Sequence, residues 1–528
     1  MKKLIYSLGF FFALGASAQT NIELLKDINT SAGSLPKKFV EFDGKMYFTA
    51  DNGTDGNELW VSDGTEGGTN MVKDINTSGS SNPSNLFVFN NNLYFSADDG
   101  DNDIELWMTD GTSGGTVMVK DINSSGSSNP RSFVVYKGSL FFSADDGSNG
   151  RELWTTDGTA GGTTLFMDIN TTGDGDPSNF YVFNDTLYFG ANDGTNGKEL
   201  WVSDGTAANT EMLANINTTD GSHPNNFIEF NGKLYFTAES SNNNYELWMT
   251  NGTVGGTEIL KDIHPTGSSY PNDLTVFDGA LYFKADNGTE GIELWKSDGT
   301  PNGTEMFVDI NSNGNSSGNP SFFHEYNEKL YFVADDGTYG VELWETDGTE
   351  LGTKMSMDLN TAPSIGSSPR NLISYSGKLY FTAQGTTGEI HMYESDGTLQ
   401  GTTLITLAGA TELSPCQYSN EFLVYNEALY FNAKYTADGD EVYRVVNPTA
   451  GISTNEVTAF SVYPNPVIDQ LTVASEKASK FKMIDLNGRV ILTADVQGEE
   501  SIDISHLKAG MYLLIDESTG NQQKIIKK

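Results

Sequence analysis

Two kinds of short glycine-rich segment place aspartate and asparagine at fixed spacing. One has the pattern of Asp74-Ile75-Asn76-Thr77-Ser78-Gly79, and the other has the pattern of Asp98-Asp99-Gly100. Oxygen donors at alternate positions before a glycine are typical of part of a calcium loop, because Ca²⁺ takes about six to eight oxygen ligands on a tight turn. The candidate calcium ligands are Asp74, Asn76, Asp98, Asp99, Asp121, Asn123, Asp145, Asp146, Asp168, Asn170, Asp309, Asn311, Asp335 and Asp336.

A second interpretation of these segments needs no metal. The fifth residue of the first pattern is Ser78, and the twelfth is Asn85, where a calcium loop has a bidentate acid. Aspartate and asparagine in glycine-rich turns commonly accept hydrogen bonds from their own backbone. Calcium is therefore the one cofactor that the sequence suggests, and turn formation is the alternative.

Residues suited to catalysis are scattered along the chain. A catalytic site in a repeat protein should break the repeat with several titratable residues in one unit. The candidates instead fall in different places: His223, His264, His324, His391, Lys284 and Lys434. The sequence shows no Ser/His/Asp order, metal-spaced histidine cluster or phosphate loop. It predicts that the chain is not an enzyme.

The tryptophans reveal the repeat that positions all these residues. They are spaced 47 residues apart five times and then 49, and two tyrosines continue the series at spacings of 49 and 50. A fixed period of this length is typical of a repeat architecture. The aromatic residues at this register are expected to form core rather than sugar-stacking surfaces. They are Trp60, Trp107, Trp154, Trp201, Trp248, Trp295, Trp344, Tyr393 and Tyr443.

Each repeat unit contains four strand-like segments, for example residues 132–136, 140–144, 152–156 and 165–169. Tight turns join them into two hairpins. Four short antiparallel strands with aromatic residues at fixed places match a blade of a β-propeller. A β-solenoid is the rival, but its coils usually need only two or three strands in about 20–30 residues. In a propeller, the connections after strands two and four lie on one face, so that face would carry the aspartate-rich segments.

The two ends of the array are complementary. Residues 22–29 read as a fourth strand with no first three before it, and residues 422–446 read as three strands with no fourth after them. Each orphan strand alone would leave a sheet edge unpaired. If the two ends share one blade, the fold is an all-β, closed β-propeller of about nine four-stranded blades. Eight blades is the alternative, if the weakly matching unit around Tyr393 is displaced.

The repeated phrase Glu58-Leu59-Trp60-Val61-Ser62-Asp63-Gly64-Thr65 resembles the signature of the bacterial ELWxxDGT repeat family. The phrase returns at 105–112, 152–159, 199–206, 293–300 and 342–349, with departures at 246–253 and 391–398. The resemblance covers most of residues 22–446. It implies a propeller and an exported location, without a known activity.

The first 18 residues have the layout of a secretory signal peptide. Lys2-Lys3 precede an apolar run from Leu4 to Leu14, and small residues end it at Ala16-Ser17-Ala18. Cleavage would separate Ala18 from Gln19. A membrane anchor is the alternative, but the apolar run is shorter than the roughly 20 residues needed to span a bilayer. The predicted layout is a signal peptide at 1–18, a propeller at 19–446, a linker at 447–458 and a second domain at 459–528.

The second domain combines alternating strands with Asn-Gly and Ala-Gly turns, which predicts a small Ig-like β-sandwich. It begins with Tyr463-Pro464-Asn465-Pro466, carries Gly510-Met511-Tyr512 near its end, and finishes with Lys527-Lys528. These features resemble the type A C-terminal sorting domain of the type IX secretion system of Bacteroidetes. The resemblance implies a partner in the secretion machinery, passage through the periplasm, and a product that is secreted or attached to the outer surface. An ordinary adhesion module is the alternative.

Charge limits the partners. From Gln19 to Ser453 the chain has 20 Lys plus Arg against 61 Asp plus Glu, a balance that repels nucleic acid. The single cysteine, Cys416, excludes an internal disulfide.

The sequence favours a monomeric, non-catalytic propeller that acts as a binding or adhesion scaffold for an unidentified extracellular glycan or protein. An extracellular polysaccharide-acting enzyme with blade-specific loop residues is the alternative.

Overall fold

The computed structural model describes residues 21–241, 244–362, 365–407, 409–417, 419–437, 439–446, 460–463, 467–484, 490–508, 510–516 and 522–527. Contacts divide the chain into two compact units, one of residues Thr20–Asn447 and one that contains Pro448–Lys528. The predicted signal peptide, its cleavage site at Ala18 and Gln19, and the predicted linker at 447–458 lie outside the described residues. Each unit is described by itself.

The first unit contains nine four-stranded antiparallel sheets among its described residues, numbered here as sheets 1 to 9 in chain order. Sheets 1 to 4 are β2–β5 (Lys37–Phe42, Lys45–Asp51, Asn57–Ser62, Asn70–Lys73), β6–β9 (Ser84–Phe89, Asn92–Asp98, Ile104–Thr109, Val117–Lys120), β10–β13 (Arg131–Tyr136, Ser139–Asp145, Arg151–Thr156, Thr164–Met167) and β14–β17 (Ser178–Phe183, Thr186–Asn192, Lys198–Ser203, Thr210–Ala214). Sheets 5 to 8 are β18–β21 (Asn225–Phe230, Lys233–Ser240, Asn244–Thr250, Glu258–Lys261), β22–β25 (Asn272–Phe277, Ala280–Asp286, Ile292–Ser297, Thr304–Val308), β26–β29 (Ser321–Tyr326, Lys329–Asp335, Val341–Thr346, Lys354–Met357) and β30–β33 (Arg370–Tyr375, Lys378–Gln384, Ile390–Ser395, Thr403–Ile405). Sheet 9 is β34 (Phe422–Tyr425), β35 (Ala428–Ala433), β36 (Glu441–Val446) and β1 (Asn21–Lys26).

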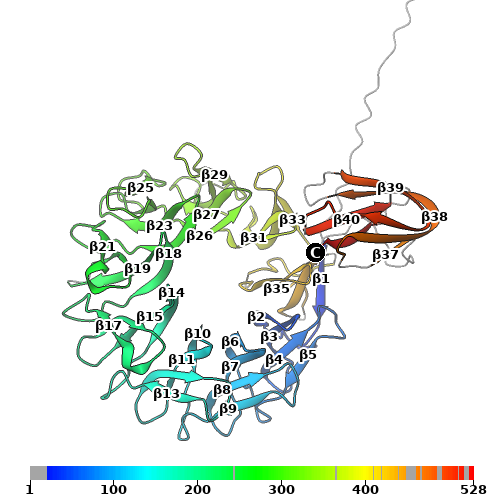
Figure 1. The fold of residues 1–528 in the computed structure, drawn as a ribbon. Coiled ribbons are helices and arrows are strands. Elements are labelled where there is room, and N and C mark those ends of the chain that lie inside the picture. The colour runs from blue at the N-terminus through cyan, green and yellow to red at the C-terminus, as the bar shows by residue number, and fades with distance from the viewer. Residues whose placement is uncertain are drawn as a thin grey trace, which may run out of the picture. The chain divides into compact units, whose positions relative to one another are not determined.

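Sheet 9 is built from both ends of the unit. β1 pairs antiparallel with β36, with Ile22 opposite Val445 and Leu24 opposite Tyr443. The first strand of each sheet contacts the first strand of the next, and β34 contacts both β30 and β2. Figure 1 shows the sheets following one another around a common axis, so the arrangement is propeller-like. Two 3-10 turns, Ala207–Asn209 and Val254–Gly256, are the only helical segments among the described residues.

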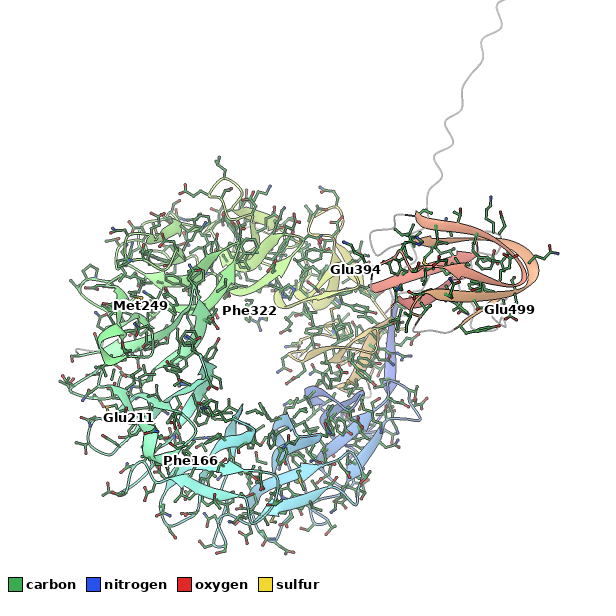
Figure 2. The ribbon with its side chains drawn as sticks, in the orientation of Figure 1. Phe166, Glu211, Met249, Phe322, Glu394 and Glu499 are labelled. Atoms are coloured by element: carbon green, nitrogen blue, oxygen red, sulfur yellow. The ribbon has the colours of Figure 1, made fainter. Side chains whose placement is uncertain are left out.

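The second strand of each sheet is buried on both faces. In β7, for example, Leu93, Tyr94, Phe95, Ser96 and Ala97 are all at most 1% exposed. A strand that is covered on both sides reads as a continuous apolar run rather than as an alternating one. Side chains fill the space between neighbouring sheets (Figure 2), so each sheet is covered by the sheets on either side of it.

The aromatic residue at the repeat register packs against the preceding sheet. Trp154 of β12 shares one cluster with Phe89, Tyr94 and Leu106 of sheet 2. Six other members of the series are buried, with at most 8% exposure: Trp60, Trp107, Trp201, Trp295, Trp344 and Tyr443. Trp248 and Tyr393 are partly buried.

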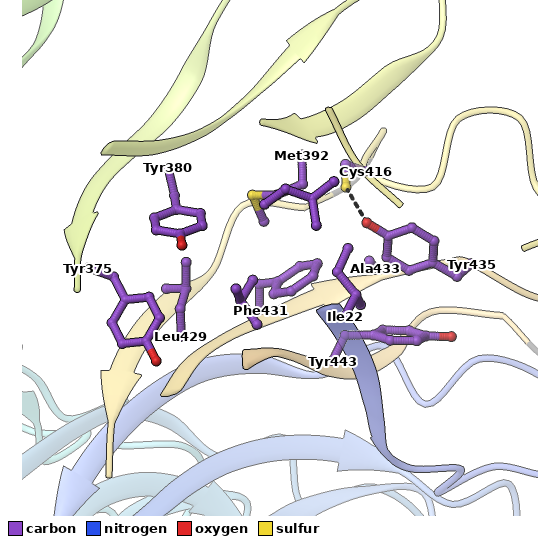
Figure 3. Close-up of a cluster of buried hydrophobic side chains, with 12 residues drawn as sticks. Ile22, Tyr375, Tyr380, Met392, Cys416, Leu429, Phe431, Ala433, Tyr435 and Tyr443 are labelled. Atoms are coloured by element: carbon purple, nitrogen blue, oxygen red, sulfur yellow. Dashed lines mark hydrogen bonds between the residues drawn. The ribbon is translucent and has the colours of Figure 1, made fainter. Parts of the chain in front are cut away.

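A cluster of buried side chains joins sheets 8 and 9. Ile22 of β1 packs with Phe431 and Tyr443 of sheet 9 and with Met392 of sheet 8 (Figure 3). Cys416 belongs to this cluster as a buried free thiol, and its Sγ lies 3.7 Å from Oη of Tyr435. Burial raises the pKa of this thiol to about 11, so it is a packing residue rather than a reactive one.

The second unit forms one curled five-stranded antiparallel sheet instead of the predicted two-sheet sandwich. Its strands are β37 (Phe460–Tyr463), β38 (Gln470–Ile484), β39 (Val490–Asp503), β40 (Gly510–Asp516) and β41 (Gln522–Lys527).

A bulge explains this difference from the sequence-based prediction. The long strand β38 shifts register between Ser475 and Ser479 against β39. It pairs with β37 before this irregularity and with β40 after it. A bulged strand bends and twists more strongly. One continuous strand therefore serves both halves of the curl, and a core that includes Phe460, Phe481 and Leu514 lies inside it.

No helix among the described residues is long and apolar enough to cross a membrane.

Candidate functional site

Hydrogen bonds within the turns themselves close the aspartate-rich segments that follow the second strands. Asp98 Oδ1 accepts a 2.6 Å hydrogen bond from the N–H of Gly100, and Asp99 Oδ1 accepts bonds of 3.0 and 2.8 Å from the N–H groups of Asp101 and Asn102. The same pattern recurs at Asp145, Asp146, Asp335 and Asp336. These are Asx turns, in which the carboxylate takes the place of a backbone carbonyl.

The segments that follow the fourth strands are also held locally. Asn76 Oδ1 accepts bonds of 3.2 and 2.9 Å from the N–H and the Oγ of Ser78. Equivalent bonds hold Asn123 and Asn170, and Asn311 accepts a bond from the side-chain amide of Asn313. Turn formation therefore accounts for the hydrogen bonds of these asparagines.

The aspartates of the same segments behave differently. Asp74, Asp168 and Asp309 each bury their Oδ1 without a hydrogen-bond partner among the described residues, and burial raises the pKa of Asp309. Burial, with a smaller contribution from the nearby Asp121, raises the pKa of Glu105. In the part of the chain that the structure describes, no group of three or more His, Cys, Asp or Glu residues could hold a metal ion. Calcium binding stays a prediction.

A buried glutamate joins the third strand of each of eight sheets to the segment that leads to the next sheet. Glu58 is fully buried, and its carboxylate accepts hydrogen bonds of 2.8 Å from the N–H of Ser81 and 3.1 Å from the N–H of Ile75. The equivalent residues are Glu105, Glu152, Glu199, Glu246, Glu293, Glu342 and Glu441. This glutamate opens the repeated Glu-Leu-Trp phrase, but the sequence alone does not indicate its role.

Burial raises the pKa of each of these carboxyls, and in Glu152, Glu293 and Glu342 it raises the pKa to about 7. Glu152 and Glu293 share a local cause. The serine that donates its hydroxyl in other sheets is replaced by Gly175 and Gly318, so the carboxylate receives only backbone N–H bonds there. Fewer hydrogen bonds stabilise the charged form less.

Two further contacts join neighbouring sheets. Lys120, at the end of β9 in sheet 2, donates a 2.7 Å hydrogen bond to the carbonyl of Thr163 in sheet 3. Its Nζ lies 5.8 Å from the centroid of the Trp154 ring, also in sheet 3. Gly111 adopts a φ of 91°, and a Cβ there would lie 2.5 Å from Oη of Tyr47 in the preceding sheet. The repeated Asp-Gly-Thr turn therefore needs glycine both for its backbone conformation and for this close approach.

One surface differs strongly between sheets. We call it the first-strand rim, and it consists of the residue before the proline that precedes each first strand and of the first two residues of that strand. The residues before the proline are Leu35, Asn82, Asn129, Asp176, His223, Tyr270, Asn319 and Ser368. The first strand residues are Lys37, Ser84, Arg131, Ser178, Asn225, Asn272, Ser321 and Arg370. The second strand residues are Lys38, Asn85, Ser132, Asn179, Asn226, Asp273, Phe322 and Asn371.

A pocket of about 390 Å³ lies on the rim between sheets 5 and 6. It is lined by Asn225, Asn226, Thr237, Tyr245, Tyr270, Pro271 and Asn272. The rings of Tyr245 and Tyr270 are stacked, with centroids 5.7 Å apart and planes 24° apart. Both tyrosines break the repeat, since Asn57 and Ile104 stand at the position of Tyr245 in sheets 1 and 2. This break in the repeat is visible in the sequence, although tyrosine is not among the residue types considered for catalysis.

A second pocket, of about 540 Å³, lies where sheets 8, 9 and 1 meet. It is lined by Leu35, Lys37, Arg370, Asn371, Gln417, Ser419, Asn420, Asn432 and Asp440. Sheet 9 is irregular beside this pocket. β34 begins only at Phe422, and the N–H groups of Asn420 and Glu421 bond to the side chain of Asn432, which lies in the neighbouring strand β35.

The titratable residues considered for catalysis lie in separate places. His324 Nε2 is 2.7 Å from Ser374 Oγ, and His223 Nδ1 is 3.9 Å from Glu239. Lys284 pairs with Asp273 at 2.7 Å, and Lys434 pairs with Glu412 at 3.6 Å. His264 follows β21 and His391 is in β32. These six residues therefore do not form one constellation.

Comparison with solved structures gives similarity to hydrolytic enzymes. A puromycin hydrolase complexed with PGG is 12% identical over 68% of this chain and 60% of its own, with a TM-score of 0.34. A structure from a study of two prolyl endopeptidases is 9% identical over 82% of this chain and 54% of its own, with a TM-score of 0.37. The chain thus spans little more than half the length of these structures. No curated protein matches the chain.

These neighbours contradict the prediction that the chain is not an enzyme, because the similar structures are those of enzymes. With TM-scores of 0.34 and 0.37, the likeness assigns no reaction to this chain.

Residues 461–528 match a family of secretion system C-terminal sorting domains. This match confirms the prediction that the C-terminal end carries a secretion sorting domain. It supports export to a secreted or cell-surface location and an interaction with the type IX secretion machinery. The chain therefore carries a secretion sorting domain at its C-terminal end, and in the sequence this domain follows a propeller-like array of four-stranded sheets.

Proposed function

We propose that the chain is an exported, closed, nine-bladed β-propeller that serves as a ligand-binding scaffold on the cell surface or in the medium. Nine four-stranded sheets, the pairing of β1 with β36 and the contact of β34 with β2 support this architecture. The repeated Glu-Leu-Trp and Asp-Gly-Thr phrases support membership of the ELWxxDGT repeat family. The first-strand rim is the proposed binding surface.

The backbone of the rim carries the proposal. In each of sheets 1 to 8, the residue before the proline and the second residue of the first strand have positive φ without being glycine. This conformation is uncommon outside glycine, asparagine and aspartate, and costs an ordinary residue about 1–2 kcal/mol. Three bulky residues nonetheless occupy it and are exposed: Leu35 by 54%, Tyr270 by 60% and Phe322 by 53%.

Strained residues persist when function requires them, so an exposed bulky side chain at such a position indicates a binding role. The rest of the blade points the same way. The glutamate, tryptophan and glycine positions change little between sheets, whereas the rim combines cations, acids, amides and aromatics. A constant scaffold with a variable rim is the arrangement expected of a binding surface.

The test replaces all three bulky residues by the asparagine that other sheets have at these positions. Asparagine tolerates positive φ, so L35N/Y270N/F322N should unfold at the same or a higher temperature than the wild type. The wild type is first tested for binding against a panel of polysaccharides and surface proteins. We expect the triple variant to lose binding to whichever of these the wild type binds. The matched control is Leu351→Asn, because Leu351 is 99% exposed on the Asp-Gly-Thr side of sheet 7, away from the rim. Wild-type binding by the triple variant would overturn the proposal.

Export has its own test. Deleting residues 461–528 should leave the folded array inside the cell, as measured by fractionation and immunoblotting. Unchanged appearance of the truncated chain at the surface or in the medium would contradict the role of the sorting domain.

A further inference from the structure

We infer that the pocket formed by Tyr245 and Tyr270 binds a neutral saccharide. This inference rests on the proposed binding role of the first-strand rim and names a ligand class for one place on it. Four properties of the described pocket carry it: an exposed aromatic ring, a stacked partner ring, a network of amides, and a lining without Lys or Arg among its described residues.

The exposed ring is Tyr270. Its phenol stacks on Tyr245 with a centroid separation of 5.7 Å, yet the residue stays 60% exposed. An aromatic ring presents an apolar face of this kind to the C–H groups of a sugar, while its hydroxyl stays available for hydrogen bonding. The backbone of Tyr270 has a φ of 46°, where Asn82, Asn129 and Asn319 stand in other sheets. A tyrosine here costs backbone strain that asparagine avoids.

The supporting ring is Tyr245. Burial and the neighbouring Glu239 carboxyl raise the pKa of its phenol to about 12, so the phenol stays protonated. The stack with Tyr270 limits the orientations of both rings. A preorganised aromatic platform loses little conformational entropy when a ligand binds.

Amide and hydroxyl groups line the rest of the pocket and hold one another in place. Asn226 Nδ2 lies 3.3 Å from Thr237 Oγ1 and 3.2 Å from Asn272 Oδ1. Thr237 Oγ1 donates a 2.6 Å bond to Asn225 Oδ1. Amides offer both donors and acceptors, which matches the mixed hydrogen-bonding character of sugar hydroxyls. Their mutual bonds keep these groups positioned before any ligand arrives.

Charge selects a neutral ligand. No Lys or Arg is among the described residues that line the pocket. Two acidic side chains flank the lining residues: Glu239 is near the Tyr245 phenol, and Asp273 pairs with Lys284 at 2.7 Å. An anionic sugar would meet these acidic side chains with no Lys or Arg among the described lining residues, which is unfavourable in a partly buried site. The volume of about 390 Å³ is within the range of small-ligand pockets.

The experiment measures binding of neutral hexasaccharides of glucose, xylose and mannose to the full exported chain by isothermal titration calorimetry, with oligogalacturonate as the acidic probe. We expect at least one neutral probe to bind with a Kd below about 1 mM. Tyr270→Ala and Asn226→Ala should each weaken that binding by about tenfold or more, whereas Tyr270→Phe should retain it within about threefold because the ring remains.

The matched control is Tyr339→Ala, since Tyr339 is also an exposed tyrosine, 49% exposed, in the β27–β28 loop of sheet 7. It should bind as the wild type does. The inference is wrong if no neutral probe binds, if Tyr270→Ala binds normally, or if Tyr339→Ala is equally impaired. Binding of the acidic probe or of a protein, lost in L35N/Y270N/F322N but kept in Tyr270→Ala, would overturn this inference and leave the proposed function standing.

Discussion

Ser34 Oγ donates a 2.6 Å hydrogen bond to Oε2 of Glu441, although 407 residues separate them in the chain. The N–H groups of Ile28 and Asn29 bond to the same carboxylate. In the other sheets, the equivalent glutamate and its donors are 17 to 25 residues apart, as at Glu58 and Glu342. The contact that elsewhere links consecutive segments thus links the two ends of the array in sheet 9.

This contact predicts that Glu441 is as important for stability as an internal glutamate. Glu441→Ala leaves several buried donors without an acceptor, and each such group costs about 1–3 kcal/mol. We expect the free energy of unfolding in urea to fall by at least about 3 kcal/mol. Glu105→Ala, in sheet 2, is the matched control, and its free energy of unfolding should fall by a similar amount. If Glu441→Ala changes stability far less than Glu105→Ala, the ends are not joined in solution.

The buried glutamates predict that the array is less stable at higher pH. Glu152, Glu293 and Glu342 have pKa values of about 7 in the folded chain, above the usual value of a glutamate. The folded state therefore holds more protons than the unfolded state between these values, and stability falls as pH rises from about 4.5 to about 7. Urea midpoints at about pH 5 and about pH 8 should show the fall. Glu152→Gln should reduce it, and a midpoint that rises with pH would contradict the prediction.

The Asp-Gly-Thr turns predict an opposite loss in acid. Hydrogen bonds from Thr159 lower the pKa of Asp157, so the folded state favours its charged form. This contribution is present above the usual pKa of aspartate, about 3.9, and is lost as pH falls through the lower folded value. We expect Asp157→Asn to lessen acid unfolding slightly, as followed by circular dichroism from about pH 5 to about pH 2. Asp101→Asn, in a different turn, is the control.

Gly111→Ala tests the packing of one sheet against the next. The added Cβ would meet Oη of Tyr47 and would adopt a φ of 91°, so we expect a loss of about 1–2 kcal/mol or more in unfolding free energy. Tyr47→Phe removes the obstructing hydroxyl and should recover part of the loss in the double variant. Gly114→Ala, with no atom within 4 Å of its added Cβ, should be nearly neutral. Equal effects of Gly111→Ala and Gly114→Ala would refute this packing.

Lys120→Met tests the contact between a lysine and the tryptophan of the next sheet. Methionine stands at the equivalent position in sheet 3, as Met167 beside Trp201, so the fold accepts it. Loss of the hydrogen bond to Thr163 and of the cation–π contact with Trp154 should cost about 1 kcal/mol. Thermal unfolding followed by tryptophan fluorescence measures it, with the exposed Lys45→Met as control. A stability equal to that of the wild type would show that the contact contributes nothing.

The sequence predicted the elements well because the repeat is written in local patterns. The Trp register, the apolar run of the second strand and the Asp-Gly-Thr turn each specify a strand or a turn with nearby residues alone, and the sorting domain is recognisable from a few short motifs. The hydrogen bonds of Glu58 and the close approach of Gly111 to Tyr47 could not be predicted. Ser81, the partner of Glu58, lies in a later segment, and Tyr47 lies in the preceding sheet.

By itself, the sequence determined an all-β repeat with four strands per unit, a strongly acidic surface and an export-directing C-terminal end. Periodicity, turn residues and charge are local or additive properties, so they can be read without coordinates. Tertiary structure alone decided which carboxylates are buried, that the second unit is one curled sheet, and that Tyr245 meets Tyr270 beside an amide-lined pocket. Those outcomes depend on which segments become neighbours in space. The stacking of Tyr245 on Tyr270 and the hydrogen bond between Ser34 and Glu441 are both set by packing between sheets rather than by any one segment.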